Sequence, residues 1–427
     1  MPTVTHTFTA RSCRAVVVGV AIWLVSAAPL RSDAGTFTIA VIPDTQNYVD
    51  YRQQKAAGFP LDSSALFLEQ MRYLADRARS RGGEIVFALN LGDMKQHFSL
   101  DIDAASKARG LKRVPNPAFG YYEGPTPEVR REEIPLLVRG YRMLDGVLPF
   151  SVVPGNHDYD AFWTDAAHPP DPAKGGSYLY GMTRYTGLDD FCSAFSDQSP
   201  FFKGRSWYVA SHDCGADSAQ VFEAGGYRIL HIGLQFNAPD GSLAWARSVI
   251  DRFPRLPTII STHHYLAPNG ERGREVLADP ERNQPQAVWD KLIAQTDQIF
   301  LVLSGHRCTQ GFRSEANARG HRVYQILSDY QCRWQVAKNA GRTESGVGLG
   351  DGWLRLLQFD TGAAVPTVHV RTYSTYFKKF STELPEYAEW YKPGERPGYS
   401  DEEFLAVDDF LLELRDFRAR FADAKIK

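Results

Sequence analysis

The sequence predicts a mixed α/β fold in which two stacked, mixed β-sheets carry helices on their outer faces. Short apolar segments with strand character alternate with amphipathic helical segments, and the strands are too numerous for one doubly wound sheet. Hydrophobic residues make up 43% of the 427 residues, which is enough to bury a large core. The composition is therefore that of a globular protein, and the sequence has no internal repeat or low-complexity tract.

The first 34 residues differ in character from the rest of the chain. Arg11 and Arg14 precede an apolar run from Ala15 to Ala28, and Pro29 and small residues follow it. This order is typical of a secretory signal peptide with its cleavage site. The alternative is a membrane anchor, but the run is shorter than the ~20 apolar residues that span a bilayer. We therefore expect an exported protein, periplasmic or extracellular, with no transmembrane segment in its mature chain.

The first elements after this segment predict a βαβ unit. Residues 36–42 and 84–91 are apolar runs with the length of buried strands. Between them, one face of a helix is marked by Leu66, Phe67, Met71, Leu74 and Ala78. Further strands are predicted at residues 149–153, 227–236, 257–262, 299–304, 322–328, 353–359 and 367–372, and helices at residues 242–253 and 286–295.

Two segments rich in Pro, Gly, Tyr and Asp are expected to form long loops, at residues 97–125 and 159–206. Loops of this length in a compact domain are usually functional. A helix is expected to begin at Thr126, with Pro127 in its first turn. Pro135 is expected to kink or divide that helix, because proline lacks the N–H that a helix interior requires.

The tail of the chain predicts a helix that begins at about Ser400. Glu403 completes a capping box with Ser400. An apolar stripe follows at Phe404, Val407, Leu411, Leu414 and Phe421. We therefore expect one large domain at residues 35–375 and a C-terminal extension at residues 376–427, with the terminal helix packed on the domain.

The charge balance excludes a strong electrostatic attraction to nucleic acid. The 48 Lys and Arg residues are offset by 50 Asp and Glu residues, which gives a formal net charge of -2. A chain of this kind has no basic field to gather phosphate backbones and no acidic tail. No nucleic-acid-binding signature is present, so partners have to be inferred from individual sites.

Export also decides how the cysteines are interpreted. Once Cys13 is removed with the signal peptide, four cysteines remain: Cys192, Cys214, Cys308 and Cys332. An oxidising compartment favours disulfides, and four cysteines allow three connectivities. We prefer the pairs Cys192 with Cys214 and Cys308 with Cys332, because each closes a loop of modest length.

Polar residues follow five of the predicted strands directly. They are Asp44 and Gln46, Gly92-Asp93, Gly155-Asn156-His157-Asp158, His263-His264, and Gly305-His306. The carboxyl ends of strands in an open α/β sheet form the edge where ligands bind, so these residues are expected to converge. Oxygen donors mixed with imidazoles suit Zn, Mn, Fe or Co better than Ca. A carboxylate among them can bridge two ions at about 3.5–4 Å.

Two histidine assignments follow from position in the sequence. His263 is the expected ligand of the His263-His264 pair because it lies nearer the strand, and His264 is expected to pack against the site or to support it. His97 lies four residues after Asp93, and we interpret it as an exposed loop histidine rather than as part of the site.

This ordered set resembles the calcineurin-like metallophosphoesterases, whose pattern is Asp-x-His, Gly-Asp, Gly-Asn-His-Asp/Glu, His and Gly-His-x-His. The resemblance covers residues 37–327. The Asp-Thr-Gln-Asn-Tyr segment at 44–48 and the Ser-Asp-Tyr-Gln segment at 328–331 are similar to a subgroup of exported bacterial members. The resemblance implies a four-layer αββα sandwich of two mixed β-sheets flanked by helices.

The resemblance also implies a role for each motif residue. Asp93 would bridge two metal ions, and Asp44 would bind the first. The second ion would be completed by Asn156, His263 and His306. His157 would contact the phosphate and the leaving oxygen, and Asp158 would orient His157.

Two positions depart from the family pattern, and both belong to the first ion. Gln46 replaces the first histidine, and Cys308 replaces the last. Gln46 can still bind through its amide oxygen. Cys308 is either a thiolate ligand or, if it pairs with Cys332, no ligand at all, because metal binding needs the thiolate. The sequence thus leaves open whether the protein holds one ion or two.

The resulting expectation is an exported, metal-dependent phosphoesterase that hydrolyses a small-molecule or macromolecular phosphate ester by means of metal-activated water. The alternative is a non-catalytic or weakly active protein that binds a single metal on the same fold, and the changes at Gln46 and Cys308 motivate it.

Overall fold

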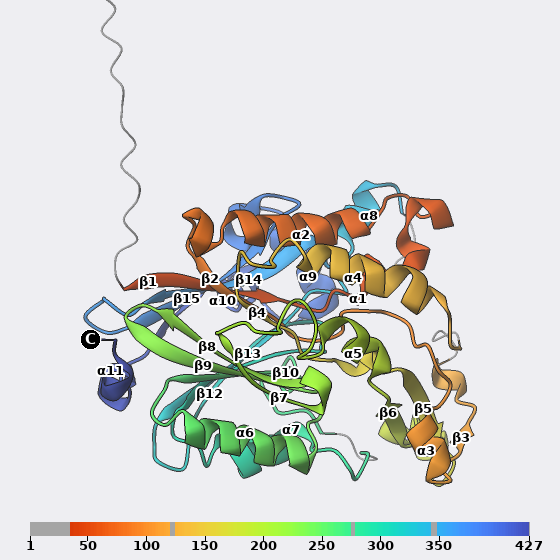
Figure 1. The fold of residues 1–427 in the computed structure, drawn as a ribbon. Coiled ribbons are helices and arrows are strands. Elements are labelled where there is room, and N and C mark those ends of the chain that lie inside the picture. Colours follow the sequence, from red (N-terminus) through yellow and green to blue (C-terminus); the bar gives the residue numbers. More distant parts are fainter. Residues whose placement is uncertain (1–34, 120–123, 275–277, 343–347, 427) are drawn as a thin grey trace, which may run out of the picture. The chain divides into compact units, whose positions relative to one another are not determined.

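Two seven-stranded β-sheets form the centre of the protein (Figure 1). The structure is a computed structural model that describes residues 35–119, 124–274, 278–342 and 348–426. The predicted signal peptide, residues 1–34, lies outside the described residues. The described residues belong to one compact unit. The fold is mixed α/β with several mixed sheets, which confirms the predicted class.

The first sheet combines parallel and antiparallel strands from both ends of the chain. Its order is β16-β15-β14-β1-β2-β4, and β17 also pairs with β15. β1 is parallel to β2 and antiparallel to β14, and β2 is parallel to β4. The strands are β16 (Lys379–Phe380), β15 (Thr367–Ser374), β14 (Trp353–Asp360), β1 (Thr36–Ile42), β2 (Ile85–Asn90), β4 (Phe150–Ser151) and β17 (Phe410–Glu413).

The second sheet has the order β12-β13-β11-β10-β9-β8-β7. Its four central strands, β13, β11, β10 and β9, are parallel, and antiparallel strands complete both edges. The strands are β12 (Thr309–Ala316), β13 (Arg322–Asp329), β11 (Ile299–Gly305), β10 (Thr258–His264), β9 (Tyr227–Leu234), β8 (Asp217–Ala224) and β7 (Tyr208–His212). The parallel strands bring their carboxyl ends to one edge.

Helices lie on the outer side of each sheet (Figure 1). α2 and α4 pack on the first sheet, whereas α6, α7 and the turn after α7 pack on the second. The helices are α1 (Gln46–Val49), α2 (Ser64–Asp76), α3 (Ala104–Ala108), α4 (Ile134–Tyr141), α5 (Asp189–Phe195), α6 (Asp240–Arg252), α7 (Pro285–Val288), α8 (Gln335–Asn339), α9 (Tyr387–Glu395), α10 (Asp401–Ala406) and α11 (Phe417–Arg420).

Alternation along β1 explains why the first sheet is buried on both faces. Ile39 and Val41 belong to the core between the two sheets, and Ala40 and Ile42 belong to the core beneath α2 and α4. Successive side chains of a strand point to opposite faces, so one apolar run serves two cores. This explains why residues 39–42 are consecutive apolar residues in the sequence.

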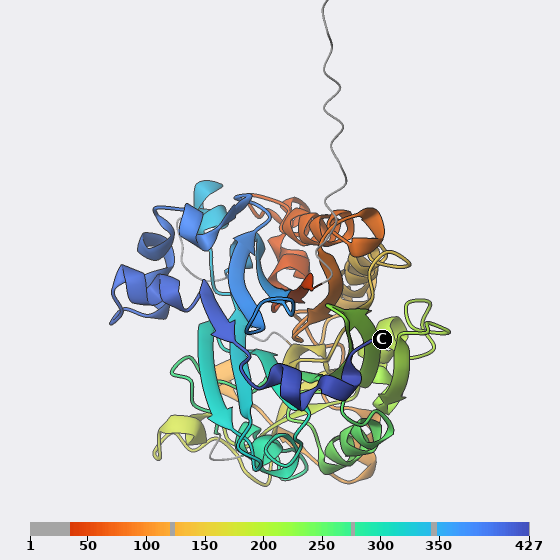
Figure 2. The ribbon, with the colours of Figure 1, turned by 90° about the vertical axis from the view of Figure 1, so that its left-hand side faces the viewer.

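The predicted continuous helix from Ser400 is wrong. The capping box of Ser400 with Glu403 is present, but α10 ends at Ala406 and the chain continues as strand β17. Leu411 is 59% exposed, whereas Leu412 and Leu414 are buried, which is the two-residue period of a strand. Figure 2 shows this segment crossing one end of the two sheets, where Lys425 forms a bridge with Tyr227 of β9.

The two segments expected to be long loops contain regular structure. A third sheet joins them, in the order β3 (Arg113–Val114), β5 (Ala161–Asp165) and β6 (Thr183–Thr186). The helices α3 and α5 also lie within them. The helix expected from Thr126 begins as a π-helix at Val129–Glu133 and continues directly as α4, with Pro135 in the first turn of α4. The backbone is helical at Glu133 and Ile134, so the chain changes from π-helix to α-helix near this proline without being divided.

Two disulfides, Cys192–Cys214 and Cys308–Cys332, confirm the preferred pairing, and both fit an oxidising compartment. The first joins the middle of α5 to the turn before β8, and the second joins the loop after β11 to the segment after β13. Among the described residues, no helix combines the length and the apolar character needed to cross a membrane.

His231 of β9 is a buried histidine within the second sheet. Its Nδ1 lies 2.6 Å from Gln220 Oε1 and its Nε2 lies 2.9 Å from Ser261 Oγ. Burial lowers the pKa of His231 from 6.5 to about 3. The unfolded chain therefore takes up a proton below pH 6.5 that the folded protein accepts only near pH 3.

We expect the free energy of unfolding to fall as the pH falls from 6.5 towards 3, with His231 contributing about 1 kcal/mol per pH unit. His231→Gln removes this contribution while keeping a polar partner for Gln220 and Ser261. Urea unfolding at several pH values between about pH 7 and pH 4 measures both slopes. Equal slopes in the two proteins would contradict the assignment.

Candidate metal centre

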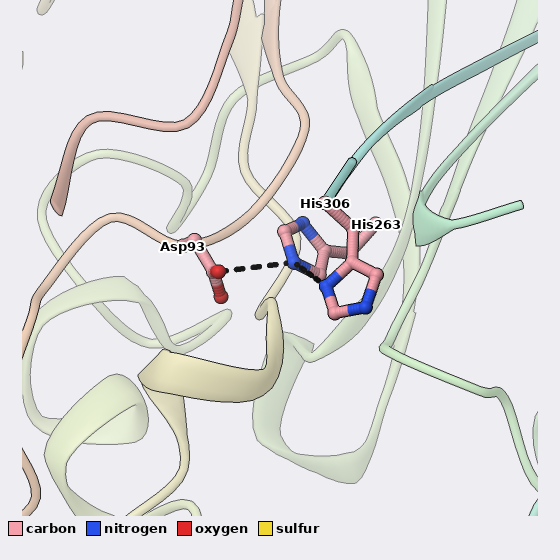
Figure 3. Close-up of side chains that lie close together, drawn as sticks. All are labelled: Asp93, His263 and His306. Carbon is pink, nitrogen blue, oxygen red and sulfur yellow. Dashed lines mark hydrogen bonds and ion pairs between the residues drawn. The ribbon is translucent and has the colours of Figure 1, made fainter. Parts of the chain in front are cut away.

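Side chains from four separate strand ends meet at one edge of the two sheets. Asp93 follows β2, Asn156 follows β4, His263 is near the end of β10, and His306 follows β11. Figure 3 shows Asp93, His263 and His306 with their polar atoms turned towards one another. The parallel direction of these strands places all four residues at the same edge, as the sequence predicts.

His263 Nε2 is at the centre of this group. It lies 3.1 Å from Asp93 Oδ2, 3.1 Å from Asn156 Oδ1 and 3.1 Å from His306 Nδ1. On the other side of the ring, His263 Nδ1 lies 2.8 Å from the carbonyl oxygen of Leu91. A carbonyl only accepts, so Nδ1 carries the hydrogen and the lone pair of a neutral ring is on Nε2. Metal-ligating histidines are commonly oriented in this way.

The four atoms fit a metal ion. They are a carboxylate oxygen, an amide oxygen and two imidazole nitrogens, and lone pairs that face one another in a buried site repel unless a proton or a cation lies between them. Ligands of a tetrahedral zinc ion at about 2.0–2.1 Å lie about 3.3 Å from each other. The three separations from His263 Nε2 are close to this value, and the ligand atoms of Asp93, His263 and His306 all lie within 4.8 Å of one another, so this group could hold an ion.

The carboxylates of the site differ in their electrostatic surroundings. Burial raises the pKa of Asp44 well above its usual value, and the neighbouring carboxylates of Asp329 and Asp93 add to the increase. Burial also raises the pKa of Asp158 to about 6 and that of Asp329 to about 7. Burial acts in the same direction on Asp93, but the imidazoles of His263 and His157 lower its pKa overall. The site therefore concentrates negative charge that a cation would stabilise.

Glycines permit the close approach of the loops. A Cβ atom at Gly155 would lie 2.2 Å from Asp93 Oδ1, and one at Gly305 would lie 2.2 Å from Asp44 Oδ1. Asp93 and His306 themselves have left-handed backbones, with φ values of 49° and 72°. Such conformations are costly outside glycine and concentrate at functional sites.

Asp158 connects two loops through their backbones. Its carboxylate accepts hydrogen bonds from the backbone N–H groups of Met94 at 3.0 Å, Lys95 at 3.1 Å and Gly155 at 2.8 Å. His157 donates its own N–H to Asp93 Oδ1 at 2.8 Å, and its Nδ1 lies 2.7 Å from the carbonyl oxygen of Gln96. Asp158 thus fixes the backbone on both sides of His157.

Two residues of the loop after β2 have roles that sequence reasoning missed. Lys95 is buried, and its Nζ donates to the carbonyl oxygens of His97, His157 and Tyr159 at 2.8, 2.8 and 2.9 Å. The prediction that His97 is exposed is wrong, because it is 4% exposed and its Nδ1 lies 2.6 Å from Glu133 Oε1. Glu133 comes from the π-turn before α4, so the sequence gave no local signal of this pair.

The residues expected to bind the first ion, Asp44 and Gln46, lie beside Asp93 in the segment after β1. Asp44 Oδ2 accepts the N–H of His306 at 3.1 Å, and Gln46 Nε2 lies 3.4 Å from Asp93 Oδ2. Cys308 is bonded to Cys332, with Cα atoms 5.8 Å apart, so it is not a thiolate ligand. His264 pairs with Asn237 Oδ1 at 3.0 Å, and its ring packs against the ring of His306 with the centroids 4.6 Å apart.

Asp329 and Gln331 also reach this side of the site, although the motif analysis did not assign them. Gln331 Nε2 lies 3.1 Å from Asp329 Oδ2 and 3.5 Å from Asp44 Oδ2, and its Oε1 contacts Gln46 Nε2. The sequence contained a signal, because Ser-Asp-Tyr-Gln follows a strand just as the other motifs do.

Two other groups of potential metal ligands occur among the described residues. Asp50, His97 and Glu133 form a buried group, and His212, Asp213 and Asp217 form a partly exposed one. The carboxylates of the first group already have partners within the chain, since Asp50 pairs with Arg52 and Glu133 pairs with His97. The group around His263 is the one that combines strand-end position with converging lone pairs.

A comparison with models of known protein families finds no match, and a comparison with curated proteins finds no similar protein. The fold and the site define a mixed α/β protein with a buried Asp/Asn/His group that could hold a metal ion.

Replacing Lys95 tests how firmly the loops beside the site are held. Lys95→Met leaves three buried carbonyl oxygens without their donor, so we expect the free energy of unfolding to fall by about 3 kcal/mol. Urea unfolding measures the change, and Lys203→Met, at an exposed lysine, is the control. A loss as small as that of the control would show that the three hydrogen bonds contribute little.

Proposed function

We propose that this protein is an exported, metal-dependent phosphoesterase with the four-layer αββα sandwich of the calcineurin-like metallophosphoesterases. The single observation that carries the proposal is the convergence of Asp93, Asn156 and His306 on His263 Nε2, each at 3.1 Å. These residues occur in the order and local sequence of that family, and helices flank both sheets. The two disulfides support export.

Asp93, Asn156, His263 and His306 are the residues that would hold a divalent ion such as Zn, Mn, Fe or Co. When bound, such an ion supplies Lewis acidity to a phosphoryl oxygen and lowers the pKa of water. The chain orients its ligands in advance, because Leu91 fixes the ring of His263 and the backbone N–H of His157 holds the carboxylate of Asp93. Preorganised ligands lose little entropy when the ion binds.

His157 is the residue proposed to transfer a proton to the leaving oxygen. The hydrogen bond from its Nδ1 to the carbonyl of Gln96 leaves Nε2 as the nitrogen for proton transfer. Burial lowers the pKa of His157, although Asp93 opposes this effect. A bound phosphate ester is anionic and favours the protonated ring, which is the form that a general acid requires.

The proposal is tested on the purified full-length protein by measuring metal content and hydrolysis of mono-aryl and bis-aryl phosphates. We expect the protein to retain at least one divalent ion and to hydrolyse one of the two substrate types. The bond of Cys308 to Cys332 favours the second candidate, a non-catalytic or weakly active protein that binds one metal ion. A metal-loaded protein that hydrolyses neither substrate would support that candidate and contradict the proposal.

We expect Asp93→Asn and Asn156→Ala each to remove the metal ion and to abolish hydrolysis. Both side chains are proposed ligands at strand ends, and asparagine at position 93 keeps an oxygen for the N–H of His157. Elemental analysis measures the loss. The control is Asp351→Asn, because Asp351 is also buried and shares the φ value of 49°, but it bonds to α8. Unchanged metal content in both site variants would contradict the assignment.

We expect His157→Ala to retain its metal and to lose hydrolysis rate by roughly 10²–10⁴-fold, the range of a general acid. The loss should shrink for substrates with good leaving groups, because these need little protonation. Rates across a series of aryl phosphates of different leaving-group pKa measure the trend. An equal loss across the series would show that His157 only positions the phosphate.

A further inference from the structure

Two strands of the third sheet, β3 and β5, line a small cavity together with residues 98–101. Its volume is about 110 Å³. An apolar cavity of about 150 Å³ binds benzene, so a space of this order accommodates a single aromatic ring. The side chains that give the cavity its apolar character are those of Phe98, Leu100, Val114, Phe119, Phe162 and Trp163.

The walls of this cavity continue directly from the two loops that carry the candidate site. Phe98 lies five residues after Asp93, and Phe162 lies five residues after His157. The two segments run side by side, because the backbone N–H groups of the two residues after Phe98 donate to the carbonyl oxygen of Asp160 at 3.0 and 2.9 Å. The ring of Phe98 packs against the ring of His157, with the centroids 5.6 Å apart. The proposed proton donor therefore contacts a wall of the cavity.

A row of aromatic rings also connects the cavity to the metal centre. The ring of Phe162 stacks on Phe98 and on Tyr185, with centroid distances of 5.6 and 4.9 Å. Tyr185 meets Phe236 edge to face at 5.1 Å, and Phe236 lies 5.6 Å from the ring of His306. The space between the proposed proton donor and a proposed metal ligand is thus bordered by aromatic side chains, which favour contact with another aromatic ring.

The polar groups of the cavity have partners within the chain. Among the described residues that line it, the charged ones are Asp101 and Arg113, and they pair with each other at 3.2 Å. The amide nitrogen of Asn116 donates to Thr164 Oγ1 and to the carbonyl oxygen of Tyr180, both at 2.8 Å. The lining therefore balances its own charge, and an uncharged ring suits it better than a charged group.

We infer that this cavity binds the leaving group of the substrate, and that the substrate is a phosphate ester of an alcohol with one aromatic ring. The inference rests on the proposed function, because it places the ester at the metal centre and the leaving oxygen near His157. Phe98 contacts both His157 and the cavity, so the ring has to follow the leaving oxygen closely. A nucleotide fits less well, because its sugar separates the base from the leaving oxygen. Phe162 and Val114 are then residues that determine specificity.

Two variants of the full-length, metal-loaded protein test this inference. Val114→Phe places a ring in the cavity, and Phe162→Leu removes one ring from its wall. The substrates are phenyl phosphate and hexafluoroisopropyl phosphate, or the matching diesters, because phenol and this alkyl alcohol have similar acidity. We expect each variant to lower kcat/KM for the phenyl ester at least about tenfold and to leave that for the alkyl ester unchanged.

The matched control is Val209→Phe, because Val209 of β7 lines a separate cavity that shares no residue with this one. It should hydrolyse both esters like the wild type. An equal loss for both esters in the two cavity variants, or no loss in either, would overturn the inference. Uridine monophosphate is a third substrate, and a loss confined to it would show that the cavity holds a base and would overturn the assignment to aryl esters.

Failure of the proposed function gives a different result, which is a wild type that hydrolyses none of these esters. The cavity is then tested by calorimetry with phenylphosphonate and methylphosphonate, which have no ester bond to break. We expect phenylphosphonate to bind more tightly, and we expect Val114→Phe to remove the difference. Equal binding of the two phosphonates to the wild type would overturn the inference independently of turnover.

Discussion

The side chain and carbonyl of Asp93 connect the loops that form the site. Its Oδ1 accepts the N–H of His157, its Oδ2 lies 3.1 Å from His263 Nε2, and its carbonyl oxygen accepts the N–H groups of Thr45 and Gln46 at 2.9 Å. These contacts require Asp93 to adopt a left-handed backbone. Three strand ends are thereby fixed around one carboxylate, and the cost in backbone strain is offset by those hydrogen bonds.

The strand-end rule made much of the site predictable. Asp93, Asn156, His263 and His306 were identified because each follows an apolar run, and parallel strands bring such positions together. The same rule applies to Asp329, but its motif lacks the glycine that precedes Asp93, Asn156 and His306. The pairing of His97 with Glu133 was not predictable, because it joins residues 36 positions apart through the packing of α4.

The sequence predicted those strands well whose two faces are both buried, and it predicted less well those strands that have one face exposed. β1, β10 and β11 each contain a run of apolar residues and are buried along most of their length, and their predicted bounds lie within two residues of the observed ones. β12 and β8 were missed because they contain many polar residues and no long apolar run, and both belong to the antiparallel outer parts of the second sheet. The tail was assigned the wrong period, because Phe404, Leu411 and Leu414 satisfy a helical spacing while β17 uses a spacing of two.

The first sheet pairs strands from the two ends of the chain, and this limits how early the chain can fold. β1 lies between β2 and β14, and Thr36 pairs with Asp360, so a central contact of the sheet joins positions more than three hundred residues apart. β15 and β17 come later still. A chain that is still being synthesised cannot complete this sheet, and contacts of such long range slow folding. The first sheet therefore stays incomplete until its last strands have been made, and this delay is compatible with the proposed export of the chain before it becomes compact.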